Sequence, residues 1–307
     1  MKYLIGMDGG GTKTKCIITD INLNPIYETI GGASNFLVIG TETVSETIIN
    51  LINDCTSSQK ISADDIEAIV IGTTGGGRRN DAELLEKQIS SDAKQKSLVI
   101  NKFRVESDAR IALEGAFSGK AGSILIAGTG SIMFGKDDKS EIHRVGGFGR
   151  YIGDEGSGYR IGRIGLNAVA RYFDGRSKPT KIADLLEQEF SIGSSETLIT
   201  EVYRNNFNIA AVAPLVFDAA ESGDKIAQRI LEDEANELML HINAMKLKLN
   251  VQILKVSLIG SLLTTANYFS YLFNEMVIRK FNDVKIMEAE HSPEFGAAIL
   301  AKQLTFS

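Results

Sequence analysis

Two short segments of this 307-residue chain combine small residues with groups that suit phosphate binding. Residues 8–13 read Asp-Gly-Gly-Gly-Thr-Lys, and residues 128–131 read Gly-Thr-Gly-Ser. Glycines let backbone N–H groups approach phosphate oxygens closely, and successive N–H groups form a nest for anions. The carboxylate of Asp8 would repel a phosphate unless Mg²⁺ stood between them. The two segments therefore predict a metal–nucleotide site, although a tight hairpin with an aspartate in its turn is the simpler alternative for the first.

Neither segment matches the two best-known phosphate-binding motifs. Gly6 and Gly11 have the spacing of a P-loop, but Thr12 stands where that motif needs lysine. The second segment has Met133 in place of the third glycine of the dinucleotide fingerprint, and strand-like apolar residues follow it. What remains in both places is a glycine turn between two strands.

Carboxylates and amides elsewhere could act on the acceptor of a phosphoryl group. Asp108 follows an apolar run and opens a predicted helix, where it could cap the helix or accept a hydroxyl proton. Residues 146–158 hold six glycines and two adjacent carboxylates, which indicates either recognition of a polyhydroxyl ligand or a flexible surface loop. Asn35 could supply a further amide or belong to a plain turn. Residues 259–266 indicate a strand, a glycine and a helix start, which could face a nucleotide.

The spacing of apolar residues predicts the elements that position these groups. In the first part of the chain, buried runs alternate with amphipathic segments, which is typical of an α/β fold with a mostly parallel sheet. The strand–turn–strand pattern of the first segment returns at 123–134, which indicates a second, related lobe. We predict strands at 3–7, 15–19, 26–30, 66–72 and 103–106, and helices at 43–55 and 81–90.

The later part of the chain is predicted to be rich in helices. Helical spacing is found at 159–173, 182–190, 196–205, 213–222 and 225–250. A strand at 256–260 should lead into one helix running from Ser261 through Arg279, before a last strand at 284–288 and a closing helix at 294–304. We expect an N-terminal lobe of residues 1–118, onto which 294–307 packs back, and a C-terminal lobe of residues 119–293.

The composition argues against several classes of function. The net charge of −6 and the pI near 5.3 provide no basic field for nucleic acid or an anionic membrane. No apolar run suits a signal peptide or a membrane span, so we expect a cytoplasmic protein. The two cysteines, Cys16 and Cys55, are too few and too isolated for a disulfide framework or a zinc site, and should be buried thiols. His143, His241 and His291 are dispersed, without the spacing of a triad or a metal site.

With these segments in order, the sequence resembles the N-acetylglucosamine kinase branch of the actin-like ATPase and sugar-kinase superfamily. The likeness spans nearly the whole chain, and its most specific part is Gly-Asp-Glu-Gly-Ser at 153–157 after Gly-Gly-Phe-Gly at 146–149. It implies an α/β fold of two actin-like (ribonuclease H-like) lobes with a central ligand cleft, the second lobe being larger and helix-rich. Phe148 stands where the family has tryptophan, and Phe36 is the aromatic residue after Asn35.

The resemblance also implies an activity, the ATP-dependent phosphorylation of an amino sugar at its 6-hydroxyl. N-acetylglucosamine is the first expectation, followed by N-acetylmuramic acid or glucosamine, and the enzyme should be a homodimer without nucleic-acid or membrane partners. Asp108 would be the catalytic base, and Asp8 would hold Mg²⁺ through water. The residues implied to contact ATP are Gly9, Gly10, Gly11, Thr12, Lys13, Thr129, Gly130, Gly260, Ser261 and Thr265. The residues implied to contact the sugar are Asn35, Asp108, Gly146, Gly147 and Asp154.

Two other functions stay open for a chain of this kind. The same branch includes ATPases that activate 2-hydroxyacyl-CoA dehydratases, which bridge their subunits with an iron–sulfur cluster. Cys16 and Cys55 lack the glycine-flanked setting expected of its ligands. The second is a sugar sensor that has the fold without catalysis, and intact Asp8 and Asp108 argue against it. The sugar-kinase branch with a cysteine zinc motif is excluded by the cysteine count.

Overall fold

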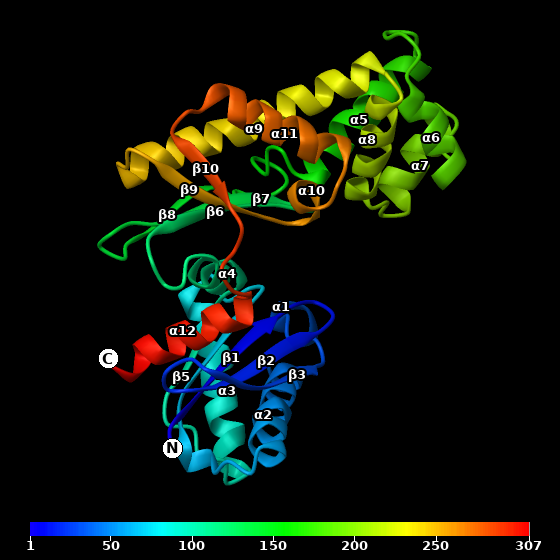
Figure 1. The fold of residues 1–307 in the computed structure, drawn as a ribbon. Coiled ribbons are helices and arrows are strands. Elements are labelled where there is room, and N and C mark those ends of the chain that lie inside the picture. The colour runs from blue at the N-terminus through cyan, green and yellow to red at the C-terminus, as the bar shows by residue number, and fades with distance from the viewer. Residues whose placement is uncertain (307) are drawn as a thin grey trace. The chain divides into compact units, whose positions relative to one another are not determined.

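The computed structural model describes residues 1–306, and the chain separates into two compact units (Figure 1). Unit 1 contains residues 1–122, residues 138–140 and the C-terminal segment from Glu288. Unit 2 contains residues 123–137 and residues 141–287. Each unit is built around a five-stranded sheet of its own.

The sheet of unit 1 has the strand order β3-β2-β1-β4-β5. Its strands are β1 (Tyr3–Gly9), β2 (Thr14–Asp20), β3 (Pro25–Gly31), β4 (Ile66–Thr73) and β5 (Phe103–Ser107). Strands β1, β2 and β3 form an antiparallel meander, whereas β1, β4 and β5 run parallel. The helices of this unit are α1 (Phe36–Ile39), α2 (Thr41–Ser58), the 3₁₀ turn η1 (Ala63–Asp65), α3 (Arg79–Gln95), α4 (Asp108–Ala116) and α12 (Pro293–Thr305).

Alternation along β1 explains why this sheet is covered on both faces. Ile5 and Met7 pack into a core with residues of α2 and α3, whereas Leu4 packs into a second core with residues of α4 and α12. Gly6 allows α12 to lie directly on the strand, since a Cβ there would stand 2.2 Å from the carbonyl oxygen of Glu294. This close approach brings Glu294, in the first turn of α12, next to the strand that ends at Asp8 and Gly9.

The sheet of unit 2 has the order β10-β9-β6-β7-β8. Its strands are β6 (Gly122–Ala127), β7 (Ser131–Lys136), β8 (Ile142–Gly146), β9 (Leu254–Ile259) and β10 (Val284–Met287). Strands β6, β9 and β10 are parallel, and β7 is antiparallel to β8. The helices of this unit are α5 (Gly158–Phe173), α6 (Lys181–Phe190), α7 (Ser195–Arg204), the 3₁₀ turn η2 (Ile209–Val212), α8 (Ala213–Glu221), α9 (Lys225–Leu249), α10 (Ser261–Thr264) and α11 (Tyr268–Lys280).

One predicted helix is wrong, and one strand, one short α-helix and the two 3₁₀ turns were not predicted. The segment expected to form one helix from Ser261 through Arg279 is divided into α10 and α11 (Figure 1). Asn267 causes the break because it begins α11 with a capping box, accepting the Ser270 N–H while the Ser270 hydroxyl accepts the Asn267 N–H. Strand β8 and the short helix α1 fall where only loop was expected.

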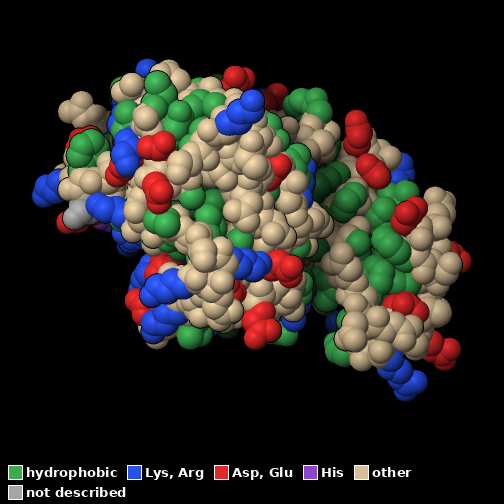
Figure 2. Space-filling model, turned by 90° about the horizontal axis from the view of Figure 1, so that it is seen from below, with side chains coloured by type: hydrophobic (Ala, Val, Ile, Leu, Met, Phe, Trp, Pro, Cys, Tyr) green, Lys and Arg blue, Asp and Glu red, His purple; other side chains and the backbone are tan. Residues whose placement is uncertain are grey.

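The distribution of charged side chains on the surface is consistent with the modest net charge of the chain. On the face drawn in Figure 2, acidic and basic side chains are interspersed rather than gathered by sign. Among the helices that the structure describes, none is both long enough and apolar enough to cross a membrane.

Candidate functional site

The turn between β1 and β2 exposes the groups that sequence reasoning assigned to phosphate. Gly10 closes the turn by donating its N–H to the carbonyl of Lys13 at 3.0 Å, and its own carbonyl accepts the Ser34 N–H at 3.0 Å. Thr12 and Lys13 are exposed, and nothing lies within 4 Å of the position that a Cβ on Gly11 would take. The turn can therefore offer a hydroxyl, an ammonium group and unobstructed backbone to an anion.

Asp8 stands at the end of β1 among other carboxylates. Burial raises its pKa to about 6, and the negative charges of Glu294 and Asp108 contribute to this shift. Glu294 is buried, and its Oε2 has no hydrogen-bond partner among residues 1–306, while Oε1 lies 3.8 Å from the Lys15 ammonium nitrogen. Oxygen ligands with incompletely balanced negative charge suit a hard cation such as Mg²⁺. The donor set of unit 1 therefore fits the metal that the sequence predicts.

Asp108 is the first residue of α4, but it does not cap that helix. The N-cap is Ser107, whose hydroxyl accepts the Arg110 N–H at 3.1 Å. The Asp108 carboxylate is exposed; its Oδ1 accepts the Ala109 N–H at 2.8 Å, and its Oδ2 accepts the Thr74 hydroxyl at 3.1 Å. The capping alternative for Asp108 is thus wrong, and Thr74 is an orienting group that sequence reasoning missed.

Asn35 lies directly before α1 without capping it. Its Oδ1 is buried and has no hydrogen-bond partner within the described part of the chain. A buried amide oxygen without a partner is costly unless a ligand or water supplies a donor. Asn35 therefore has an acceptor available for a polar ligand, as its predicted sugar contact would need.

In unit 2 the turn between β6 and β7 is joined to the start of α5. The Gly128 N–H donates to the Gly130 carbonyl at 2.9 Å. The carbonyls of Gly128 and Thr129 accept the N–H groups of Gly158 and Tyr159, at 2.8 and 3.2 Å. Gly158 and Tyr159 are the first residues of α5, so this turn is fixed by a helix.

The glycine-rich segment that follows β8 is packed closely onto unit 2. Gly146 and Gly147 have φ values of +70° and +69°, and a Cβ on Gly146 would stand 2.2 Å from Nε2 of the buried His241. Arg144 donates to the carbonyls of both glycines. Only glycine suits such a conformation at such a distance. Residues 146 and 147 are therefore held in a defined backbone shape.

Asp154 adopts the left-handed region, with φ +56°, and its carboxylate accepts backbone N–H groups of Gly149 and Ser131. Burial raises the pKa of Asp154, although these two hydrogen bonds act in the opposite direction. A Cβ on Gly130 would stand 3.0 Å from Asp154 Oδ2. Asp154 thus connects the glycine-rich segment to the β6–β7 turn.

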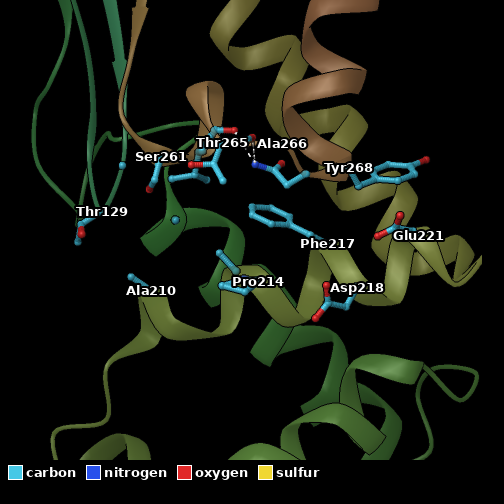
Figure 3. A pocket seen from close by; sticks show the side chains of 15 residues that line it. Thr129, Ala210, Pro214, Phe217, Asp218, Glu221, Ser261, Thr265, Ala266 and Tyr268 are labelled. Carbon is cyan, nitrogen blue, oxygen red and sulfur yellow. Dashed lines mark hydrogen bonds between the residues drawn. The ribbon is translucent and has the colours of Figure 1, made fainter.

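Beside this turn lies a nucleotide-sized pocket of about 400 Å³ in unit 2. It is lined by three predicted ATP residues, Thr129, Ser261 and Thr265, while Gly260 precedes Ser261 at the end of β9. Figure 3 shows Pro214 and Phe217 projecting from α8 toward the segment that carries Thr265. The lining residues that sequence reasoning missed are Gly158, Ala210, Ala213, Pro214, Phe217, Asp218, Glu221, Leu262, Ala266, Asn267 and Tyr268. Most come from α8 and from the break before α11, where the sequence has no glycine motif.

A second pocket of about 540 Å³ adjoins the same turn. Thr129 lines both pockets, and Gly130 and Asp154 line the second. The other lining residues are Arg150, Tyr151, Tyr159, Val202, Asn206, Phe207, Asn208 and Ile209. Unit 2 therefore has two adjacent pockets that share one phosphate-type turn.

The comparison with protein families decides what kind of chain this is. A model described as the BadF/BadG/BcrA/BcrD ATPase family matches residues 5–301. The chain belongs to this family. Its membership supports ATP as the ligand of the glycine turns.

Named relatives of this chain are sugar kinases. It is 34% identical over 307 residues to the N-acetylmuramic acid/N-acetylglucosamine kinase of Clostridium acetobutylicum, covering 98% of this chain and 99% of that protein. It is 29% identical to the N-acetyl-D-glucosamine kinase of Dictyostelium discoideum, covering 98% of each.

Solved structures show the fold. A protein from Chromobacterium violaceum, named as a candidate N-acetylglucosamine kinase, has a TM-score of 0.72 at 23% identity and 99% coverage of both chains. A ROK family glucokinase from Streptomyces griseus, solved with glucose and AMPPNP, has a TM-score of 0.56 at 16% identity, covering 98% of this chain and 99% of that one. The predicted α/β fold of two actin-like lobes is thereby confirmed.

The cysteines are buried thiols, as predicted, but they are not isolated from each other. The Sγ atoms of Cys16 and Cys55 lie 3.4 Å apart within the core of unit 1. The hydrogen bond with the Cys55 thiol, together with burial, raises the pKa of Cys16 well above its usual value, which disfavours the thiolate. Neither is placed to hold a cluster at a surface.

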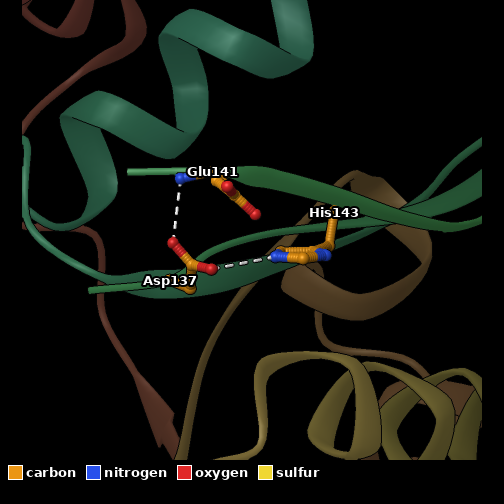
Figure 4. Close-up of side chains that lie close together, drawn as sticks. All are labelled: Asp137, Glu141 and His143. Atoms are coloured by element: carbon orange, nitrogen blue, oxygen red, sulfur yellow. Dashed lines mark hydrogen bonds and ion pairs between the residues drawn. The ribbon is translucent and has the colours of Figure 1, made fainter. Parts of the chain in front are cut away.

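One histidine has carboxylate neighbours that its sequence spacing did not indicate. Ligand atoms of Asp137, Glu141 and His143 lie within 4.8 Å of one another at the β7–β8 hairpin (Figure 4). His143 Nε2 is 3.2 Å from Asp137 Oδ2, and the Glu141 N–H donates to Asp137 Oδ1 at 2.8 Å. These hydrogen bonds explain the arrangement as part of the hairpin, and none of the three residues lines the two pockets.

Proposed function

We propose that this protein transfers the γ-phosphoryl group of ATP to the 6-hydroxyl of an amino sugar. N-acetylglucosamine is the first candidate, followed by N-acetylmuramic acid and glucosamine. The observation that supports this best is the pair of adjacent pockets in unit 2 that share Thr129. A donor and an acceptor must be held side by side for in-line transfer. The names of the relatives indicate which acceptor to expect.

The 400 Å³ pocket is proposed to hold the nucleoside of ATP. Its volume falls in the range of small-molecule sites, and the ring of Phe217 offers a surface on which a base can stack. The carboxylates of Asp218 and Glu221 are suitable acceptors for ribose hydroxyls. With the nucleoside there, the phosphates would extend toward Thr129 and Gly130. Ser261 and Thr265 line the same pocket and would add hydroxyl contacts.

The acid–base and metal roles are assigned to unit 1. Asp108 is exposed and oriented by Thr74, so its carboxylate can accept the proton of the attacking hydroxyl. Asp8, with the buried Glu294 beside it, would hold Mg²⁺, which neutralises charge on the β- and γ-phosphates when bound. The exposed turn with Gly9, Gly10, Gly11, Thr12 and Lys13 would add N–H, hydroxyl and ammonium donors to those phosphates.

The sugar is proposed to contact groups that already have defined positions. Gly146 and Gly147 have fixed backbone conformations, and Asp154 is held by two backbone N–H groups. The unsatisfied amide oxygen of Asn35 can accept a hydrogen bond from a hydroxyl. Pre-positioned polar groups reduce the entropy lost on binding.

Homodimer formation is a further proposal, which light scattering of the purified protein tests.

The proposal is tested by measuring ADP release with a panel of acceptors. The panel contains N-acetylglucosamine, N-acetylmuramic acid, glucosamine, N-acetylmannosamine and glucose, with ATP and Mg²⁺ present throughout. We expect N-acetylglucosamine to give the largest stimulation, and mass spectrometry to find one phosphate on the 6-oxygen. If no sugar stimulates ADP release, the proposed kinase activity is wrong.

The alternative of a dehydratase-activating ATPase is less well supported. Cys16 and Cys55 are both in the core of unit 1, and the chain has no other cysteine for a bridging cluster. An iron–sulfur absorption band in anaerobically purified protein would favour that alternative.

A further inference from the structure

Arg150 is a cation held by aromatic rings rather than by a carboxylate. Its guanidinium carbon lies 5.1 Å from the ring centroid of Tyr151 and 5.7 Å from that of Tyr159. Nη2 also donates to the Tyr151 hydroxyl at 3.2 Å. Within residues 1–306, Arg150 forms no ion pair with an acidic side chain. Its charge is therefore available to a ligand.

Arg150 lines the 540 Å³ pocket, which we assign to the acceptor because it adjoins the proposed nucleoside pocket at Thr129. The charged lining residues of this pocket are Arg150 and Asp154. Asp154 is already engaged, because its carboxylate accepts backbone N–H groups of Gly149 and Ser131. A neutral sugar would leave the guanidinium without an anionic partner, whereas a sugar with a carboxylate would supply one.

We propose that Arg150 binds the carboxylate of an acidic amino sugar, the 3-O-lactyl group of N-acetylmuramic acid. This inference rests on the proposed function. It names the residue that allows the enzyme to use an acceptor sugar with a negative charge. The planar guanidinium can donate two parallel N–H bonds to a carboxylate, which ammonium groups cannot match in geometry. Contact with two tyrosine rings restricts the arginine side chain, so less entropy is lost when it engages the ligand.

A phosphate of ATP is the competing partner for Arg150, because Gly130, toward which the phosphates are proposed to extend, lines the same pocket; the other walls of that pocket favour a sugar. Arg150 does not line the 400 Å³ pocket proposed for the nucleoside, although Thr129 lines both pockets. The lining of the 540 Å³ pocket combines the amides of Asn206 and Asn208 with the apolar side chain of Phe207. Such a mixture suits a substituted sugar better than a triphosphate.

The experiment compares Arg150→Met with Arg150→Lys and with the matched control Arg163→Met. Arg163 is exposed on α5 and lines neither pocket. Each variant is assayed with N-acetylmuramic acid, with its lactyl methyl ester and with N-acetylglucosamine, and KM for ATP is measured in each case. Calorimetry without ATP gives the affinity for N-acetylmuramic acid directly.

For Arg150→Met we expect kcat/KM for N-acetylmuramic acid to fall about 10- to 100-fold, as for loss of a charge-assisted pair. The losses with the neutral methyl ester and with N-acetylglucosamine should be at least tenfold smaller. Arg150→Lys should be intermediate, because it keeps the charge but not the planar fork. Arg163→Met should match the unmodified protein with every acceptor.

The outcomes separate this inference from the proposed function. Equal losses with all three acceptors, or a raised KM for ATP with each of them, would assign Arg150 to the nucleotide and overturn the inference while the kinase activity stands. A protein that phosphorylates N-acetylglucosamine but neither binds nor phosphorylates N-acetylmuramic acid would also overturn it. Arg150-dependent binding of N-acetylmuramic acid without turnover of any sugar would support the inference and contradict the proposed function.

Discussion

Each glycine turn connects two neighbouring strands of its sheet, but the surroundings of the two turns differ. The turn after β1 has exposed Thr12 and Lys13 at its tip and the partly buried Asp8 at its base. The turn after β6 has carbonyls that are occupied by the N–H groups of α5, and two pockets adjoin its Thr129. The first turn thus lies beside several carboxylates, and the second adjoins two pockets.

This difference indicates that the two units have different roles in the proposed reaction. In unit 1, burial and the negative charges of Glu294 and Asp108 raise the pKa of Asp8, which is a setting that suits metal binding and proton transfer. In unit 2 the polar groups near Thr129 are already hydrogen-bonded, which is the setting that a ligand site needs for defined geometry. Variants in unit 1 should therefore change kcat and metal dependence, and variants in unit 2 should change KM.

The largest effect is expected for Asp108→Asn. The amide cannot accept the hydroxyl proton, so kcat should fall about 1,000-fold or more. The affinity for ATP, measured by calorimetry, should stay within about threefold, because Asp108 is not among the groups proposed to bind the nucleotide. Near-normal turnover by this variant would remove Asp108 from the mechanism and break the assignment of acid–base chemistry to unit 1.

A smaller effect is expected for Asp8→Asn, in the dependence on magnesium. Loss of one carboxylate from the proposed metal site should raise the Mg²⁺ concentration for half-maximal activity about 10- to 100-fold. Glu28→Gln is the matched control, because Glu28 is an exposed carboxylate on β3 and has no part in the site. If both variants respond to Mg²⁺ in the same way, Asp8 is not part of the metal site.

How far the sequence predicts this site depends on the kind of residue. The sequence singles out Asp8, Thr129 and the segment around Asp154 as candidates because glycine density beside a carboxylate has a physical meaning that is independent of the fold. Phe217 and Arg150 could not be found in this way, because an aromatic residue on a helix or an arginine in a loop looks the same in a core or on a surface. Their placement depends on packing between elements far apart in the sequence.

The wrong helix shows the same limit from the side of secondary structure. Residues 261–279 have helical spacing, but the pattern does not show that Asn267 caps a new helix rather than continuing the old one. The break has a consequence for the site, since Thr265, Ala266 and Asn267 all line the 400 Å³ pocket. If α10 and α11 were one continuous helix, these three residues would be helical and would not form the pocket wall that the nucleoside is proposed to contact.

In unit 2, Phe217→Leu should act mainly on KM for ATP. Phe217 stacks on Phe269 with ring centroids 5.9 Å apart, and its loss should remove the surface for the base and raise KM for ATP about tenfold. Phe273→Leu is the control, because Phe273 is fully buried in the same core but lines neither pocket. It should lower the melting temperature by a similar amount and leave KM for ATP unchanged. Equal effects of the two variants on KM would mean that Phe217 serves only the core.

The smallest effect, a difference in stability, tests the carboxylate character of unit 1 without any substrate. Because the pKa of Asp8 is raised to about 6 from its usual 3.8, the folded protein binds this proton more tightly than the unfolded chain does. The stabilisation from the proton is complete below about pH 4, and it is lost as the pH rises toward 6 and above. Asp8→Asn lacks this titration. The free energy of unfolding of the variant, relative to that of the unmodified protein, should therefore increase as the pH rises from 5 to 8.

We expect that gain to be about 1 kcal/mol, less than the full shift implies, because Asp8 is only partly buried. Urea unfolding at both pH values, with EDTA present, measures it. Added Mg²⁺ should reduce the gain at pH 8, since a cation stabilises the ionised carboxylate of the unmodified protein alone. If the stability difference between the two proteins is the same at pH 5 and pH 8, Asp8 does not titrate in this window. The contrast between a turn beside a titrating carboxylate in unit 1 and a turn beside two pockets in unit 2 would then lose its main support.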